Sequence, residues 1–230
     1  MKKILMAMSA VLFIMHSPFA QKTLEKGKVI MEITDVSSND DQVAMAMEMM
    51  KGGKTEINFN SEMNSSKSEM MGGMMEIYTL TNNKTGVSDM LMNMMGQKMW
   101  ISSTIEDMKK ENSKTLSTLA VNPDMNDKKV ILGYNCFAVN VNSSDNPDMK
   151  LKCYVTKDVK TSANIIQGYQ GLNLDGFPME FMVTNAMMSL TVKAKEVSDK
   201  TDDSTFVLKT DGYKKMTSEE FKKMMGGMGF

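Results

Sequence analysis

The amino-acid sequence predicts an α+β fold in which an antiparallel β-sheet carries two or three short helices. Three observations lead to this fold class. Several segments alternate apolar and polar residues with a period of two, which is typical of strands with one buried face. Clusters of turn-forming residues separate these segments by short connections, which favour antiparallel pairing. A few other segments combine strong helix formers with capping residues.

Strands are expected where the alternation is clearest, at residues 29–33, 57–59, 75–80, 90–94, 177–184 and 190–195. In the segment 90–94 three methionines fall on one face, and in the segment 177–184 two phenylalanines flank a methionine on one face. Successive side chains of a strand point to opposite sides of the sheet. We therefore expect these residues to line its buried side.

Capping signals indicate two helices. Thr217 and Glu220 form a capping box at the start of a helix expected near residues 217–225. Ser103 and Glu106 form a second box, ahead of another run of helix formers. Both segments should therefore be helical.

Two further segments complete the predicted organisation. Residues 40–53 have an acidic start, strong helix formers and a glycine stop, so we expect a helix, although their alternating methionines also fit a strand. Residues 112–127 are expected to form a polar crossing loop. The strands after this loop are too few for a second core, so a single domain is expected over residues 21–230.

The first twenty residues read as a secretory signal peptide. Two lysines precede an apolar run from Ile4 to Met15, and small residues lead to a cleavage position after Ala20. No later segment approaches the length of a membrane-spanning helix. We expect a protein that is soluble after removal of residues 1–20 and is periplasmic or secreted. Nothing in the sequence indicates its oligomeric state.

The composition excludes several classes of function. His16, inside the predicted signal peptide, is the only histidine, and the chain has no arginine. The processed chain would therefore lack the base of Ser-His-Asp and Cys-His mechanisms, the commonest zinc ligand and the guanidinium clamps of phosphate sites. The formal net charge of −1 gives no basic excess for nucleic acid. We expect neither catalysis, nor nucleic-acid binding, nor an organic cofactor.

Two cysteines raise the question of a disulfide. A hairpin turning near Ser144 and Asp145 would place Cys136 opposite Cys153, and an exported protein meets oxidising conditions. A register slip of one residue would instead leave two buried, unpaired thiols. Both outcomes stay open from the sequence.

Several motifs occur in one order along the chain: "NMMGQKM" (93–99), "VILGYNC" (130–136), "YVTKDV" (154–159), "GFPMEF" (176–181), "MMSLTVKAKEVS" (187–198) and "FVLKTDGYKKMTSEEF" (206–221). Together they resemble domain-of-unknown-function family 4412, a set of exported, methionine-rich bacterial proteins. The resemblance implies an envelope or secreted protein, supports Cys136 more than Cys153, and brings no catalytic residue. The inferred architecture also resembles the half-barrel of bacterial lipoprotein carriers, a curved antiparallel sheet with helices against its concave face.

Methionine accounts for 30 of 230 residues, and three interpretations compete for it. Methionine is a flexible core filler, and a concave face lined by it could also bind an apolar ligand. The candidate residues for such a ligand are Met90, Met92, Met94, Phe177, Met179 and Phe181. Thioethers also select Cu(I) and Ag(I). The candidate metal ligands are Met70, Met71, Met74, Met75, Met224, Met225 and Met228. A hydrophobic carrier is the main hypothesis, and a Cu(I)-binding protein is the alternative.

Overall fold

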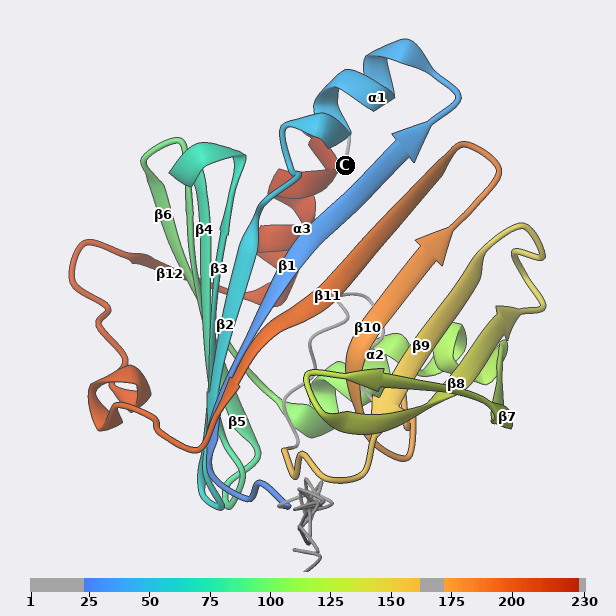
Figure 1. Ribbon diagram of the computed structural model, residues 1–230. Coiled ribbons are helices and arrows are strands. Elements are labelled where there is room, and N and C mark those ends of the chain that lie inside the picture. The colour runs from blue at the N-terminus through green and yellow to red at the C-terminus, as the bar shows by residue number, and fades with distance from the viewer. Residues whose placement is uncertain (1–22, 162–171, 228–230) are drawn as a thin grey trace, which may run out of the picture.

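A computed structural model describes residues 23–161 and 172–227, which form a twelve-stranded curved sheet with three α-helices (Figure 1). The first half contains β1 (Gly27–Ser38), α1 (Asp41–Glu48), β2 (Lys54–Phe59), β3 (Met63–Met70), the 3₁₀ turn η1 (Met71–Gly73), β4 (Met75–Asn82), β5 (Val87–Met94) and β6 (Gln97–Thr104). The second half contains α2 (Ile105–Ser117), β7 (Leu119–Ile131), β8 (Tyr134–Ser143), β9 (Lys150–Thr156), β10 (Phe177–Thr184), β11 (Met188–Ser198), η2 (Asp203–Phe206), β12 (Lys214–Met216) and α3 (Ser218–Gly227). The predicted signal peptide lies outside the described residues.

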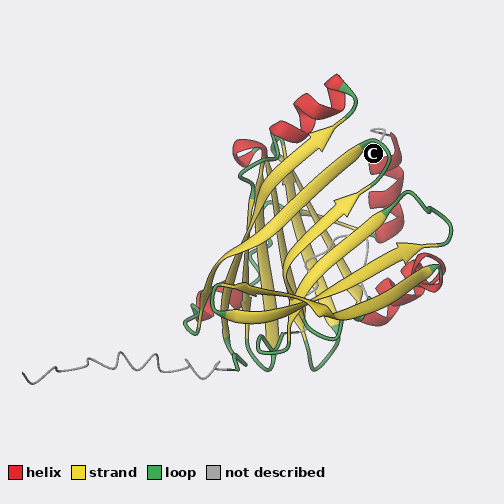
Figure 2. Cartoon of the chain, turned by 45° about the vertical axis from the view of Figure 1, so that its right-hand side comes forward, coloured by secondary structure: helices red, strands yellow, loops and turns green. Residues whose placement is uncertain are grey.

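The strand order is β12-β6-β5-β4-β3-β2-β1-β11-β10-β9-β8-β7. Two antiparallel meanders, β1 to β6 and β7 to β11, are thus joined by the pairing of β1 with β11. β12 then returns to the far edge and pairs in parallel with β6. The sheet curls around α2 and α3, which lie on its concave side (Figures 1 and 2). The predicted α+β class with a curved antiparallel sheet is confirmed.

The three predicted helices are present. Asp40 caps α1 by accepting hydrogen bonds from the backbone N–H groups of Gln42 and Val43. The predicted box at the start of α2 is shifted by one residue, because Thr104 rather than Ser103 is the N-cap and accepts from the N–H of Asp107 at 3.0 Å. Among the described residues, no helix is both long and apolar enough to cross a membrane.

The predicted crossing loop at residues 112–127 is wrong. α2 continues to Ser117, and β7 follows almost at once at the sheet edge. β7 hides its strand character because most of its residues are exposed and polar, and a bulge interrupts its pairing with β8 between Asp124 and Lys128. Polar contacts anchor it. Asp127 accepts hydrogen bonds from the ammonium group of Lys152 at 2.7 Å and from the hydroxyl of Tyr154 at 3.1 Å.

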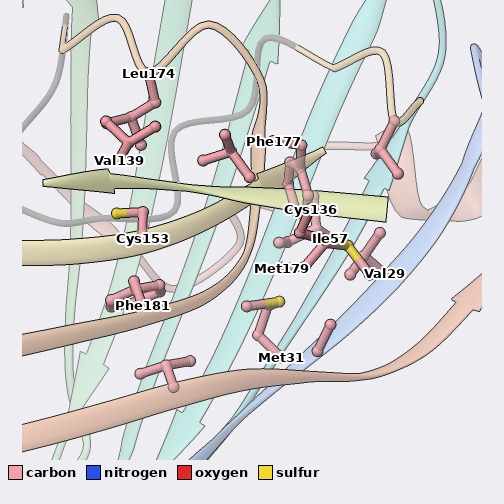
Figure 3. Packing of buried hydrophobic residues seen from close by; sticks show 14 of the residues in the cluster. Val29, Met31, Ile57, Cys136, Val139, Cys153, Leu174, Phe177, Met179 and Phe181 are labelled. Atoms are coloured by element: carbon pink, nitrogen blue, oxygen red, sulfur yellow. The ribbon is translucent and has the colours of Figure 1, made fainter. Parts of the chain in front are cut away.

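The disulfide considered above is not formed, and both cysteines are free and buried. The β8–β9 hairpin turns later than predicted, so that Val139 pairs with Cys153. Cys136 instead has Lys129 of β7 as its Cα partner. The odd offset of three residues from Val139 also directs Cys136 to the other face of β8. The two labelled cysteines lie apart in Figure 3.

A central core fills the concave face where the two meanders join (Figure 3). We define it by its largest contributors: Val29, Met31 and Ile33 of β1, Ile57 and Phe59 of β2, Val139 and Val141 of β8, Leu151, Cys153 and Val155 of β9, Phe177, Met179 and Phe181 of β10, and Val192 and Ala194 of β11. All of them are buried. Their period-two spacing is the alternation expected of a sheet with one apolar face.

Candidate functional site

A second apolar cluster lies on β4, β5 and β6 and is rich in methionine. Its ten residues, called here the methionine cluster, are Met70, Met75, Ile77, Met90, Met92, Met94, Met99, Met216, Phe221 and Met224. Strand register shows that it shares the concave face with the central core. Met92 pairs with Ile77, Ile77 with Ser68, Ser68 with Thr55, and Thr55 with Met31 of the central core.

Strand register orders the methionine cluster in rows across the sheet. Met70, Met75 and Met94 are successive partners on β3, β4 and β5 and form one row. Ile77, Met92 and Met99 form the next row. Directly opposed side chains of an antiparallel pair have Cβ atoms about 4.5–5.5 Å apart. The thioethers within a row are therefore within reach of one another.

Helix α3 supplies the covering side chains. Its predicted capping box is confirmed: the N–H of Thr217 donates to Glu220 at 2.8 Å, and the N–H of Glu220 donates to the Thr217 hydroxyl at 3.1 Å. These hydrogen bonds from Thr217 hold the pKa of Glu220 below its usual range. Phe221 and Met224, three positions apart, share the helix face that contacts the methionine cluster. The cap therefore fixes where this helix starts over the strands.

The two apolar clusters differ in how closed they are. Every central-core residue is buried, whereas Met70, Met75, Met90 and Met94 are only half-buried. Half-buried methionines on a concave face form a surface that is apolar, deformable and accessible. The methionine cluster is therefore the candidate site for a ligand.

The six predicted ligand residues fall into two groups. Phe177, Met179 and Phe181 belong to the central core, and Met92 is buried at the base of the methionine cluster. Met90 and Met94 are half-buried beside it. The structure thus places all six on the concave face and leaves Met90 and Met94 as the accessible pair.

The predicted metal ligands are also divided. Met70, Met75 and Met224 meet in the methionine cluster. Met71 and Met74 lie in and beside the η1 turn, apart from the cluster, and Met74 is 43% exposed. The Met225 side chain and Met228 lie outside the described residues.

Sequence reasoning missed several members of this cluster. Met94 was assigned to the ligand set alone, and Met99 and Met216 to neither set. The alternation of residues 90–94 was the available signal for Met94, because it placed that residue on the same sheet face as Met75.

Other potential metal-binding chemistry is sparse in the part of the chain that the structure describes. It contains no group of three or more His, Cys, Asp or Glu side chains that could hold a metal ion. Burial raises the pKa of Cys136 to about 11 and that of Cys153 to about 12. Both thiols therefore stay protonated near neutral pH, where only the thiolate is a good metal ligand.

A band of hydroxyl groups separates the two apolar clusters on the concave face. It consists of Thr55, Ser66, Ser68 and Thr79, which follow one another through strand register on β2, β3 and β4. Two of them are bonded together, with 2.8 Å between the Thr55 and Ser68 hydroxyl oxygens. The accessible apolar surface thus has a polar border on the side of the central core.

No protein-family model and no curated protein matches the sequence. Three solved structures are similar. LprF from Mycobacterium bovis matches with 10% identity over 81% of this chain and 91% of that chain, at a TM-score of 0.33. A DUF1329 family protein from Desulfovibrio piger matches with 10% identity over 81% and 91%, at 0.35. A domain from Vibrio parahaemolyticus whose name refers to outer membrane lipoprotein sorting matches with 11% identity over 82% and 92%, at 0.35. These matches are remote, the resemblance to family 4412 stays a prediction, and the site is argued from its own residues.

Proposed function

We propose that this protein binds and carries a hydrophobic ligand in the cell envelope, without catalysing a reaction on it. The ligand class is a lipid, a fatty acyl chain or the acylated end of a lipoprotein. One observation carries the proposal: the concave face holds a half-buried floor of methionines beside a fully closed core. A protein that needed these residues only for stability would gain by closing them as well.

The chemistry of the floor suits an acyl chain. Methionine has three rotatable side-chain bonds and a polarizable sulfur, so it adapts to chains of different length and unsaturation. Burying an acyl chain contributes about 0.8 kcal/mol per CH₂ group. The neighbouring hydroxyl band offers the few polar groups that lipid sites place at the polar end of a ligand.

Chain-length dependence tests this proposal. The purified protein is titrated with saturated fatty acids of increasing length, which displace a fluorescent fatty acid. Each added pair of CH₂ groups should tighten binding by more than about tenfold until the floor is filled. Native mass spectrometry of protein purified from its own envelope should show a bound lipid. A protein that is always empty and takes up no fluorescent fatty acid would refute the proposal.

A matched pair of variants locates the site. Met90→Lys places a charge on the half-buried floor and should weaken uptake at least about tenfold, because a charge is costly against an acyl chain. Met182→Lys is the control, because Met182 of β10 is 39% exposed and alternates with Phe181 onto the opposite face. Equal loss of uptake in both variants would place the ligand elsewhere.

A further inference from the structure

We propose that Met70, Met75 and Met94, with Met224 above them, form a binding site for a soft monovalent cation, Cu(I) or Ag(I). This site differs from either methionine set that the sequence indicated. It combines half of the "EMMGGMMEI" segment with a methionine from β5 and one from α3. It does not depend on the proposed carrier function.

The geometry places three thioethers on one line. Met70 is the Cα partner of Met75, and Met75 is the partner of Met94, so all three leave the sheet on the same face. The outer Cβ atoms are about 10 Å apart across the central one, from the usual cross-strand spacing. The flexible side chains of Met70 and Met94 can therefore bring their sulfur atoms over Met75.

The fourth thioether comes from the covering helix. Met224 is half-buried and packs against the same cluster. Its position is held by the capping box of Thr217 and Glu220, six turn-forming hydrogen-bonding atoms away from the strand sulfurs in neither sequence nor charge. A set of three or four neutral thioethers suits Cu(I) or Ag(I), because soft ligands select soft ions.

The charge around the site fits a monovalent ion. Glu69 and Glu76, the charged residues that neighbour Met70 and Met75 in sequence, point to the opposite face by strand alternation. A thioether ligand carries no charge, so a divalent ion would remain uncompensated there, whereas a monovalent ion costs less to accommodate. The half-buried methionines leave the ion a path from solvent.

Thioether ligation has a distinctive pH dependence. Histidine and cysteine must lose a proton before they bind a metal, so their affinity falls with pH. A thioether has no proton to lose. Affinity for Cu(I) should therefore be constant between about pH 5 and pH 8, whereas binding through the two buried thiols would strengthen as pH rises.

The test is an anaerobic titration of the purified protein with Cu(I) against a competing chromophoric chelator, repeated with Ag(I). The expected result is one ion bound more tightly than micromolar, with no pH dependence. Met75→Leu keeps the volume and removes the sulfur, and should weaken binding by at least the roughly tenfold to hundredfold seen when even a supporting residue of a metal site is lost. Met74→Leu is the matched control, because it changes the adjacent methionine outside the cluster.

Each outcome decides the proposal. Weakened Cu(I) binding in Met75→Leu and Met94→Leu, with Met74→Leu unchanged, supports the site. Binding no tighter than micromolar, equal affinity in Met74→Leu and Met75→Leu, or affinity that rises with pH would overturn it. Circular dichroism of each variant checks that it is folded. Fatty-acid uptake is measured separately on the same samples, so failure of the metal site and failure of the carrier function are distinguishable.

Discussion

Replacing Met179 tests whether the central core is closed packing or part of a ligand cavity. Met179 is 0% exposed and lies among the core residues in Figure 3. Truncating a fully buried methionine to alanine costs about 2–5 kcal/mol, because apolar contacts are lost and a cavity remains. Taking about 3 kcal/mol, Met179→Ala should lower Tm by about 6–12 °C in a chain of this size. Urea unfolding followed by far-ultraviolet circular dichroism gives the free energy directly.

The control is Met182→Ala on the same strand. Its side chain is 39% exposed and leaves the opposite face, so the change should stay within about 0.5 kcal/mol. Closed packing also predicts that Met179→Ala leaves fatty-acid uptake unaltered once the protein is folded. A loss of stability below about 1 kcal/mol for Met179→Ala, or equal losses in the two variants, would show that Met179 does not sit in a packed core.

Three further predictions follow from contacts described above. Cys136 and Cys153 should resist a thiol reagent at pH 8 until the protein is unfolded, because burial raises the pKa of both, and reductant should leave the intact mass unchanged. The ammonium partner of Asp127 lowers the pKa of its carboxyl in the folded state, so the contact stabilises the fold above the ordinary aspartate range and loses this effect as pH falls through the lowered pKa. The stability gap between wild type and Asp127→Asn, measured by urea unfolding, should therefore narrow from pH 7 to pH 3. Thr217→Ala should cost about 1 kcal/mol at the start of α3, seen as faster amide exchange in that helix without faster exchange in β10.

Local patterns predicted those parts of the fold that local physics determines. The alternating segments became strands because each buries one face, and Thr217 with Glu220 formed the box that their spacing indicated. β7 was missed because it is an edge strand with a bulge. Its exposed residues, including Pro123, show no apolar alternation, and proline is tolerated at an edge.

The candidate site could not be assembled from local patterns. Met70 and Met75 face each other because η1 turns the chain tightly, with Gly72 at φ 65°, a region open to glycine. Met94 and Met224 join them only through the register of a third strand and the docking of a helix about 150 residues later in the chain. The sequence showed which residue types were available, but the tertiary pairing decided which of them meet.

The cysteine pairing failed for a related reason. The predicted hairpin was symmetric about a short turn, whereas the actual connection between β8 and β9 extends through residues 144–149. The register moved by three residues, and an odd shift exchanges the two faces of a strand. Pairing of Cys136 and Cys153 depended on that register alone.

The return of the chain from β11 to β12 sets the order in which this protein can be completed. Each meander consists of neighbouring hairpins, but β1 must wait for β11, roughly 160 residues later, and such non-local pairing slows folding. The last segment then crosses the convex face, where the Tyr78 hydroxyl donates to the carbonyl of Thr205 at 2.7 Å, before it forms β12 and α3. A chain that emerges N-terminus first would therefore expose its methionine floor until the final segment arrives, and a ligand or ion present during that interval could load before the helix docks.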